Sequence, residues 1–489
     1  MTKAEREVLP LYYLAIDIGA SSGRHILGHL DQGRMVLEEV YRFGNQQISR
    51  NGHDCWDMDH LWKGILDGLS ACGSLGKIPA TIGIDTWAVD YVLLDGQDRP
   101  LGDAVAYRDR RTEGMDRLVE ALIPARELYA RTGIQKQSFN TIYQLMALKQ
   151  EHPEQLEQAE HLLMIPDYFH FRLTGVKKQE YTNATSTNLV HAERGSWDLE
   201  LIERLGLPAR LFGPLSMPGT PVGELLPEIQ RQVGFNAAVV LPATHDTGSA
   251  FLAVPAQDEN AVYLSSGTWS LLGVENQAPI TTEESRKANF TNEGGAWRRF
   301  RYLKNIMGLW MIQSIRRELN GNAYVAGRES RYAGEKRWSF SDLIAAAEAS
   351  AYSAEVDAND SRFLAPESMI DAIRSFCQER GEPAPETVGD LMRCVYISLA
   401  RCYRDAVGEL SALTGTTYTS VNIVGGGCQD GYLNQLTAKA LSLPVSAGPV
   451  EGTAIGNLIV QMIAAGEFQD LREARGCVRN SFEIKEVLP

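Results

Sequence analysis

A turn of glycine and small hydroxyl residues joins two apolar strands at two places in this chain, half a chain apart. The first copy comprises strands 11–16 and 24–30 around Gly19–Gly23, and the second comprises strands 262–264 and 269–274 around Ser265–Thr268. Such residues are typical of hairpin turns. Gly19 and Gly267 are 248 residues apart in a chain of 489. The pattern therefore predicts two similar halves facing each other, with a boundary near residues 250–258, and not a short-period repeat.

Length and composition narrow the class of protein further. The length predicts two or three domains, and 44% hydrophobic with 22% charged residues excludes a disordered chain. The net charge of -15 disfavours binding of nucleic acids. No apolar run is long enough to span a membrane. Residues 1–10 form a polar extension without the pattern of a secretory signal, so we expect a cytoplasmic protein.

The cysteine pattern agrees with a reducing compartment. The seven cysteines include no C-x-x-C pair and no zinc-like spacing, and their number is odd. We therefore expect reduced thiols. Whether Cys377 and Cys394, which are 17 residues apart, form a pair is left open.

Both hairpin turns have the composition of a phosphate-binding loop. Glycine and small hydroxyl residues let backbone N–H groups approach a phosphate closely, although each turn alone could be an ordinary tight turn. Neither is a Walker A loop: the nearest match to that spacing in the chain, Gly28–Met35, has Arg34 and Met35 where the motif needs Lys and Ser or Thr. Asp17 directly precedes the first turn, which predicts either a Mg²⁺ ion bridging it to phosphate or a local cap of the turn.

Two further segments carry candidate functional residues. Strand 239–241 leads into Thr244–Gly248, where Asp246 could cap a helix or accept a proton from a substrate hydroxyl, as a kinase aspartate does. His245 could bind substrate or simply pack in the core. Strand 421–424 enters a glycine turn and then a helix, which suits an adenine or phosphate or mere close packing. Its spacing, G-x-G-x-x-x-G, is one residue longer than the dinucleotide motif and disfavours an oxidoreductase.

The remaining pattern indicates mixed α/β structure. Residues 81–95 are typical of strand, polar turn and strand, and residues 320–361 of an irregular insertion. Basic residues gather in Tyr107–Thr112 and Arg298–Arg301, and the second cluster is expected to be a solvated face. Helices are expected over 143–150, 166–174, 307–319 and 391–410, and after the glycine turn of 425–427.

Taken together, the motifs resemble, in order, those of the FGGY carbohydrate kinases, over residues 11–465. The matching segments are AIDIGASSGR, GIDTWAVDYVLLD, AYRDRRT, SFNTIYQL, PDYFHFRLTG, YTNATST, HDTGSA, YLSSGTWSL, LKNIMGLW, IVGGGCQ and GPVEGTAIGN. The resemblance implies an α/β fold of two RNase H-like domains of the actin-like ATPase kind, with the active-site cleft between them. It implies domains at 11–253 (sugar and first phosphate hairpin) and 254–489 (nucleotide).

The activity that the resemblance implies is ATP-dependent phosphorylation of L-rhamnulose at its 1-hydroxyl, a step of L-rhamnose breakdown. Asp246 matches the general base, and Asp17 falls where Mg²⁺ is held through water. Residues that match the ATP site are Ala20, Ser21, Ser22, Gly23, Arg24, Thr268, Gln313 and Gly426. Residues that match sugar contacts are Ala88, His245, Asp246, Thr247 and Asn305.

One departure from the family pattern concerns the sugar. Ala88 replaces a glycine that is common in this stretch, and Arg110 occupies a position that is often smaller, so the sugar preference could differ. A kinase for L-fuculose, L-xylulose or another ketose or polyol is therefore the alternative. A non-catalytic nucleotide-binding sugar sensor is a remoter one, which the presence of both Asp17 and Asp246 disfavours.

Overall fold

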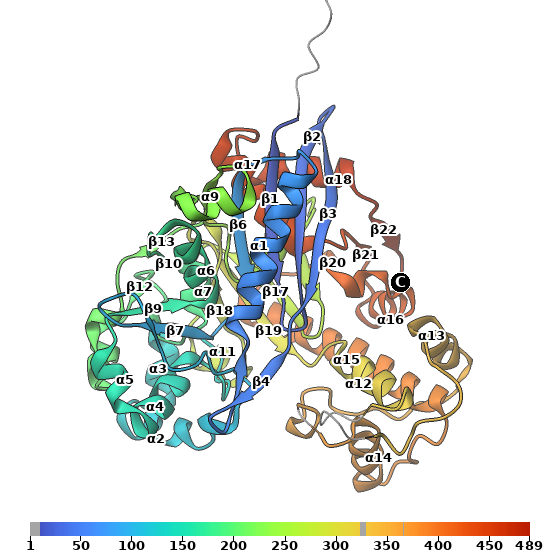
Figure 1. Ribbon diagram of the computed structural model, residues 1–489. Coiled ribbons are helices and arrows are strands. Elements are labelled where there is room, and N and C mark those ends of the chain that lie inside the picture. The colour runs from blue at the N-terminus through green and yellow to red at the C-terminus, as the bar shows by residue number, and fades with distance from the viewer. Residues whose placement is uncertain (1–9, 323–328, 365) are drawn as a thin grey trace, which may run out of the picture. The chain divides into compact units, whose positions relative to one another are not determined.

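The computed structural model describes residues 10–322, 329–364 and 366–489 (Figure 1). The chain divides into two compact units: the first comprises residues up to Pro255, Glu275–Tyr302 and Gly452–Phe482, and the second comprises Ala256–Val274, Leu303–Glu451 and Glu483–Pro489. The first unit thus includes two segments that the sequence interpretation assigned to the C-terminal domain, and the division at 253 and 254 stays a prediction. Nearly all of the polar extension, residues 1–9, lies outside the described residues.

A six-stranded sheet forms the centre of the first unit, in the order β14-β15-β6-β1-β2-β3. Strands β1, β2 and β3 are antiparallel neighbours, which confirms the first predicted hairpin, whereas β1, β6 and β15 run parallel. The strands are β1 (Tyr12–Ile18), β2 (Ser22–Asp31), β3 (Arg34–Gly44), β6 (Pro79–Thr86), β14 (Pro221–Glu224) and β15 (Ala238–Val240).

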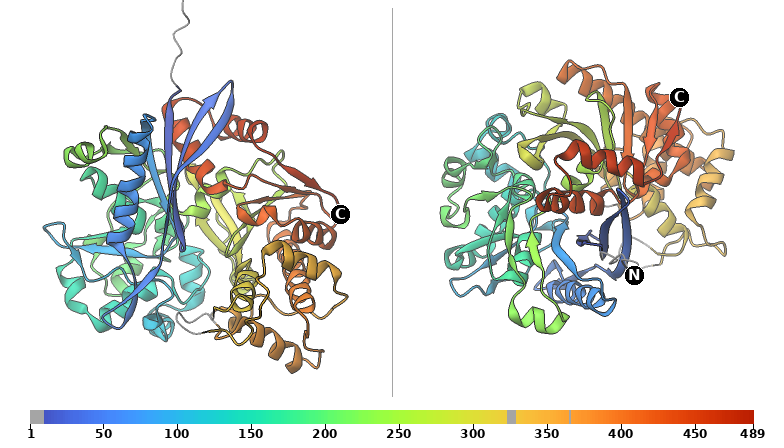
Figure 2. Two further views of the ribbon diagram at one scale, coloured as in Figure 1. Left: turned by 45° about the vertical axis from the view of Figure 1, so that its right-hand side comes forward. Right: turned by 90° about the horizontal axis from the view of Figure 1, so that it is seen from above.

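Successive side chains of β1 enter two different cores because they point to opposite faces of the sheet. Leu14 and Ile16 pack in a core with residues of α1 (Met58–Ser74) and α6 (Ile165–Thr174). Tyr13 and Ala15 pack with residues of α17 (Gly452–Ala465) and α18 (Leu471–Ser481) on the other face. Figure 2 shows the blue strands with the blue helix α1 on one side and the red helices on the other. This layering explains why β1 is almost wholly apolar.

A smaller three-stranded sheet, β8-β7-β9, packs with helices in the same unit. The strand–turn–strand pattern of residues 81–95 is present as β6 and β7, but the two strands belong to different sheets. These elements are β7 (Tyr91–Leu94), β8 (Pro100–Leu101), β9 (His161–Met164), α2 (Met115–Leu122), α3 (Ala125–Thr132), α4 (Thr141–Glu151), α5 (Pro153–Gln158), α7 (Tyr181–Thr185) and α8 (Leu199–Arg204).

Short elements complete the first unit. They are the pairs β4 (Gln47–Arg50) with β5 (His53–Trp56), β10 (Gln179–Glu180) with β13 (Leu215–Ser216), and β11 (Val190–His191) with β12 (Ser196–Trp197), and the helices α9 (Pro227–Val233), α10 (Asp246–Leu252) and α11 (Glu283–Lys287). Helix α10 begins at Asp246, the residue at which the sequence predicted a helix start.

The second large sheet has seven strands in the order β18-β19-β17-β16-β20-β21-β22. Strands β16 and β17 are antiparallel, which confirms the second predicted hairpin; β16, β20 and β21 are parallel, and β22 is antiparallel to β21. The strands are β16 (Ala261–Ser266), β17 (Ser270–Asn276), β18 (Thr291–Gly294), β19 (Phe300–Ile306), β20 (Ser420–Val424), β21 (Val445–Ala447) and β22 (Lys485–Val487). This repeats the succession of strand directions from β2 to β14 in the first sheet.

The helices of the second unit include one element that the sequence interpretation missed. Residues 340–349 were expected to be irregular, but they form α13, whose start is fixed by a capping box of Ser339 and Asp342. Residues 323–328 of the expected insertion lie outside the described residues. The helices are α12 (Trp310–Leu319), α13 (Phe340–Ala349), α14 (Met369–Glu379), α15 (Val388–Thr414) and α16 (Gly431–Leu441).

No helix in the described parts of the chain is long and apolar enough to cross a membrane. All seven cysteines lie in these parts and are free thiols. Cys377 and Cys394 are buried and close enough for each to shift the pKa of the other, and they are not joined by a disulfide.

Candidate active site

Asp246 lies at the first turn of α10, beside the end of β6. The preceding loop stays attached to that strand, since Thr86 N donates to Thr244 O at 2.9 Å. One carboxylate oxygen of Asp246, Oδ1, accepts hydrogen bonds from the backbone N and from Oγ1 of Thr247, at 2.6 and 3.1 Å. The Asp246 side chain is 31% exposed, so it is accessible to a small substrate.

The pKa of Asp246 is raised toward neutral pH. Partial burial and the negative charge of Asp17 raise its pKa to about 7, against the opposing hydrogen bonds from Thr247. A carboxylate with such a pKa accepts a proton more readily than an ordinary aspartate, yet is still substantially ionised near pH 7.

Asp17 lies at the end of β1, where the strand register brings other charged residues beside it. It is paired with Arg24 of β2 and Asp85 of β6, and Arg24 Nη2 donates to Asp17 Oδ2 at 2.7 Å. Asp85 is fully buried and accepts a hydrogen bond from Asn457 Nδ2 of α17 at 2.6 Å. Burial and the neighbouring Asp17 raise the pKa of Asp85 well above its usual value.

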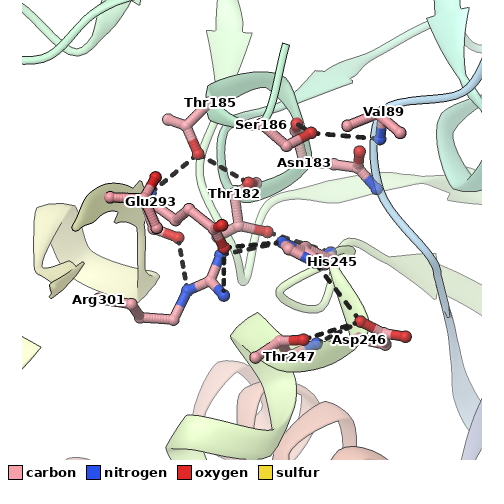
Figure 3. A network of polar contacts seen from close by, with 12 residues as sticks. Val89, Thr182, Asn183, Thr185, Ser186, His245, Asp246, Thr247, Glu293 and Arg301 are labelled. Atoms are coloured by element: carbon pink, nitrogen blue, oxygen red, sulfur yellow. Dashed lines mark hydrogen bonds and ion pairs between the residues drawn. The ribbon is translucent and has the colours of Figure 1, made fainter. Parts of the chain in front are cut away.

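The imidazole of His245 is held by residues of β18 and β19 (Figure 3). Arg301 Nη2 donates to His245 Nδ1 at 3.1 Å, and Arg301 Nη1 lies 3.0 Å from Glu293 Oε2. On the other side of the ring, Nε2 lies 3.5 Å from Asp246 Oδ1. Burial and the positive charge of Arg301 lower the pKa of His245 well below its ordinary value. The ring is therefore neutral at pH 7.

Arg301 was expected on a solvated face, and the structure corrects this. Its side chain is only 1% exposed and pairs with Glu293, whereas Arg298 of the same cluster is exposed. A buried charge of this kind must be paired to be stable. The first four residues of β19, Phe300–Leu303, are all buried, and the density of positive charge in the sequence concealed this.

Glu180 connects the segments that carry the candidate sugar contacts, and sequence reasoning missed it. Its buried carboxylate accepts hydrogen bonds from the hydroxyls of Thr182 and Thr244, both at 2.6 Å, and from the backbone N of Asn183 at 3.1 Å. Thr182 Oγ1 in turn accepts a hydrogen bond from His245 N at 3.3 Å. One carboxylate thus holds the start of α7 against the loop before α10. The only sequence signal was the position of Glu180 immediately before the YTNATST segment.

Ala88 lies in a strained turn between β6 and β7. The next residue, Val89, has φ of 68°, an unusual conformation for a β-branched residue. Its N–H donates to Ser186 Oγ at 3.2 Å. Asp90, the residue after Val89, anchors the turn. Its buried Oδ2 accepts hydrogen bonds from the indole nitrogens of Trp56 and Trp87, at 2.7 and 2.9 Å. The turn is thus over-determined by its surroundings, as expected where a backbone is positioned for a ligand.

Some of the predicted ATP-binding residues in the first hairpin turn are accessible, whereas others are needed for packing. Ala20 and Ser21 are exposed at the tip, and Ser22 and Arg24 are half-buried. Gly23 is buried, and a Cβ there would lie 2.2 Å from the Phe43 ring. Gly23 is therefore required for packing against Phe43, whereas Ala20 and Ser21 are accessible.

In the second unit, the glycine turn after β20 likewise contains glycines needed for packing and one that is accessible. A Cβ at Gly425 would lie 2.9 Å from Ser266 O, and one at Gly427 would lie 2.0 Å from Ser266 Oγ, so both glycines allow close packing. Gly426 has open space instead, which leaves it accessible to a ligand. Thr268 lies in the β16–β17 turn, where its carbonyl accepts from Trp310 N at 3.0 Å.

The predicted site residues are distributed over both units. Asp17, Ala88, His245, Asp246 and Thr247 belong to the first unit, together with the hairpin turn 20–24. Thr268, Asn305, Gln313 and Gly426 belong to the second, where Asn305 is half-buried on β19 and Gln313 half-buried on α12. In the described ranges, no group of three or more His, Cys, Asp or Glu side chains is arranged to hold a metal ion.

Comparison with known proteins places this geometry in a family. Residues 12–253 and 262–465 match the N-terminal and C-terminal domains of the FGGY family of carbohydrate kinases. The chain is 49% identical to a rhamnulokinase of Halalkalibacterium halodurans, over 98% of both chains. It is 43% identical to a rhamnulokinase of Bacillus subtilis, over 98% of this chain and 96% of that one.

Solved structures agree on the fold. The structure resembles the ligand-bound xylulose kinase of Lactobacillus acidophilus, with a TM-score of 0.76 at 18% identity, over 98% of this chain and 94% of that one. It also resembles the glycerol kinase of Plasmodium falciparum with ADP, with a TM-score of 0.75 at 15% identity and the same coverage. With two family domains matched and full-length relatives at 43 to 49% identity, this chain belongs to the FGGY family of carbohydrate kinases.

Proposed function

We propose that this enzyme transfers the γ-phosphoryl group of ATP to the 1-hydroxyl of L-rhamnulose, giving L-rhamnulose 1-phosphate and ADP. The sugar is supported by relatives named rhamnulokinase that are 43 to 49% identical over nearly the whole chain. The reaction type is supported above all by Asp246, an accessible carboxylate whose pKa of about 7 suits a general base. Such a kinase works in the cytoplasm, and the seven free thiols are consistent with that compartment.

Asp246 acts in this proposal on the sugar hydroxyl. A hydroxyl is a weak nucleophile at neutral pH, so its oxygen attacks phosphorus as the carboxylate removes the proton. The new oxygen–phosphorus bond forms while the bond from the γ-phosphorus to the bridging oxygen breaks, and ADP leaves with the electron pair. The hydrogen bonds from Thr247 to Oδ1 fix the carboxylate and leave its other oxygen, Oδ2, to receive the proton.

The first unit also offers a site for a metal ion that accompanies ATP. Mg²⁺ is usually held by one or two carboxylates together with water and phosphates. Asp17 fits this donor set, because it provides one carboxylate at a strand end, next to the exposed turn of Ala20 and Ser21. When bound, the ion neutralises charge on the phosphates. Arg24 orients the Asp17 carboxylate by its hydrogen bond to Oδ2.

The nucleotide contacts are proposed for the hairpin residues Ala20–Arg24, and for Thr268, Gln313 and Gly426. The open space at Gly426 supports a close approach of ligand to backbone. The sugar contacts are proposed for Ala88, His245, Asp246, Thr247 and Asn305.

The reaction and its sugar are tested by measuring ADP release from MgATP with L-rhamnulose, L-fuculose, L-xylulose, D-xylulose, glycerol or no sugar. We expect the highest turnover with L-rhamnulose and loss of turnover in Asp246→Asn. The matched control is Asp57→Asn: Asp57 is an aspartate at the start of another helix, where it caps α1, and Asn can replace it as the cap that accepts from His60 N. This control should keep full turnover.

The other outcomes select among the alternatives. If another ketose gives the highest turnover, the kinase reaction stands, and Ala88 and the exposed Arg110 become the positions to vary. If ATP binds but no sugar stimulates ADP release, a sugar sensor replaces the proposed enzyme. An Asp246→Asn variant with normal turnover contradicts the assignment of the base.

A further inference from the structure

We propose that Arg301 is a positioning residue that holds His245 in the tautomer with its proton on Nε2, so that His245 donates a hydrogen bond to the sugar and does not act as a second base. The inference rests on the proposed function, because it assigns a role within the same site. It concerns a residue that the sequence placed on the surface and that the structure places in the interior of the first unit.

Two hydrogen bonds and one ion pair hold the guanidinium of Arg301 (Figure 3). Nε donates to Gly294 O at 3.1 Å, Nη1 lies 3.0 Å from Glu293 Oε2, and Nη2 donates to His245 Nδ1 at 3.1 Å. The side chain is 1% exposed, and the planar fork leaves it little freedom to turn. Residues of β18 thus aim Arg301 at one nitrogen of the imidazole.

The tautomer follows from the chemistry of the two groups. Arginine stays charged in proteins and can only donate hydrogen bonds, so His245 Nδ1 has to accept. A neutral imidazole has one N–H, which is therefore on Nε2. Nε2 lies on the side of Asp246, 3.5 Å from Oδ1. The proton consequently faces the carboxylate and any hydroxyl bound next to it.

Glu293 is the group that would favour the opposite tautomer. Its Oε2 lies 3.4 Å from His245 Nδ1 and could accept a proton from that nitrogen. Its distance to Arg301 Nη1 is shorter, 3.0 Å, so the arginine engages the carboxylate and takes the place at Nδ1 as well. Removing the arginine would leave Glu293 alone opposite Nδ1.

The charged groups that face the ring come from three elements: Arg301 of β19, Glu293 of β18 and Asp246 of α10. Thr182 of α7 holds the backbone of His245 instead, because its hydroxyl accepts from His245 N. Arginine at Nδ1 disfavours a positive imidazolium, and the lowered pKa of His245 agrees with this. With Nε2 already protonated, His245 has no lone pair directed at the sugar. Asp246 is then the only proton acceptor of the pair.

The direct test is the ¹⁵N spectrum of the full-length protein labelled with [¹⁵N]histidine, with the His245 signal identified by its absence in His245→Gln. We expect wild type to show the Nε2–H tautomer from pH 6 to pH 8, without titration. In Arg301→Met we expect the Nδ1–H tautomer or the cation, because Glu293 now faces Nδ1. A wild-type signal of the Nδ1–H form, or one that titrates between pH 6 and 8, overturns the proposal.

Kinetics provide the second readout. In Arg301→Met we expect the KM for the sugar to rise at least tenfold, with a smaller change in kcat, and a second ionisation to enter the pH profile of kcat/KM. Arg301→Lys, which keeps a charged donor, should restore the single ionisation and part of the affinity. A profile of Arg301→Met with the same single ionisation as wild type contradicts the proposal.

A matched control separates positioning from stability. Arg131 donates from Nε and Nη2 to the buried Asp198 at 2.7 Å in the same unit, and no contact connects it to His245. Arg131→Met should lower Tm but leave the sugar KM and the pH profile unchanged. Because the spectrum needs no turnover, an inactive protein would contradict the proposed function, whereas a wrong tautomer in an active enzyme would contradict this inference alone.

Discussion

The proposed role of Asp246 as general base predicts that the rate of this enzyme is sensitive to pH near neutrality. With a pKa of about 7 for the free enzyme, the carboxylate is protonated below that pH and cannot accept the hydroxyl proton. We expect kcat/KM to rise with pH through about 7 and to fall to about a tenth of its plateau one unit lower. Asp246→Asn should reduce kcat by about 10² to 10⁴-fold. A wild-type profile that stays flat from pH 5.5 to 8 would falsify this role.

The same carboxylate should lower the stability of the free enzyme. A raised pKa means that the fold favours the protonated form, so stability is lost as pH rises from about 4 to above 7. Asp246→Asn removes this effect, and Asn Oδ1 can still accept from Thr247. Because the side chain is 31% exposed, solvent screens part of the effect. We therefore expect the free energy of unfolding of the variant to rise by about 1 kcal/mol at pH 8. The Tm of the first unit should rise by ~2 °C. Thermal scans should show the two proteins converging at pH 4; a constant difference argues against the shift.

At the scale of elements, α10 depends on a close contact with α17. A Cβ added at Gly456 would lie 1.8 Å from the carbonyl oxygen of Ser249, a backbone atom three residues after Asp246. Neither helix can relieve this by rotating a side chain, so Gly456→Ala should cost about 3 kcal/mol. The displacement of α10 should also reduce kcat about tenfold or more, since a small misplacement of a catalytic group is expensive in rate.

Gly476 provides the comparison for that substitution. It lies inside α18, where a Cβ would meet no atom within 4 Å. Gly476→Ala should therefore raise stability by about 0.5 to 1 kcal/mol, because alanine is the better helix former. Urea denaturation and kcat measured for both variants test the contact. If the two variants have the same stability and the same kcat, the close contact of α10 with α17 does not depend on the absence of a side chain at Gly456.

The elements that the sequence predicted well are those with local signals. Both hairpins could be located because small turn residues separate apolar runs, and α10 because Asp246 follows a strand. The capping box Ser339–Asp342 was also a local signal, but the surrounding charges and small residues concealed α13. The membership of β6 and β7 in different sheets had no local signal, since pairing with β1 and with β9 is decided by distant segments.

The candidate site shows the same limit. Asp17, Asp246 and the hairpin turn could be proposed from residue type and position. The roles of Glu180 and Arg301 could not, because each depends on a buried contact with residues more than 50 positions away. Such a contact determines whether a charged residue is solvated or paired in the interior.

At the scale of the whole molecule, each unit places its turn residues at the carboxyl ends of parallel strands. In the first sheet, Asp17 is the last but one residue of β1, and β6 ends at Thr86, to which the loop before α10 is attached. In the second, β16 ends at Ser266 and β20 at the glycine turn. Carboxyl ends of parallel strands are the usual place of ligand sites in α/β sheets. The repeated succession of strand directions therefore accounts for two hairpin turns of similar composition in one chain.

The two units should also differ in their response to acid, because all nine histidines lie before residue 246, in the first unit. His25 is completely buried and its ring contacts Ile65 O through Nε2 at 3.1 Å. Burial lowers its pKa from 6.5 to about 4. The unfolded chain therefore binds a proton near pH 6.5 that the folded chain refuses, and stability falls between pH 6.5 and 4 by up to ~3 kcal/mol.

His25→Gln isolates this effect, because glutamine keeps an N–H donor near the Nε2 position but cannot become charged. Buried carboxyl groups such as Asp90, whose pKa burial raises to about 6, act in the opposite direction as pH falls, so the histidine is measured by the difference between variant and wild type. Calorimetry at pH 7, 5.5 and 4 should show that, as pH falls, the Tm of the first unit becomes several degrees higher in the variant than in wild type. The Tm of the second unit should be the same in both proteins. His152→Gln, at an exposed position, should show no such pH-dependent gain. If His25→Gln also shows none, His25 is accessible to protons in the folded state.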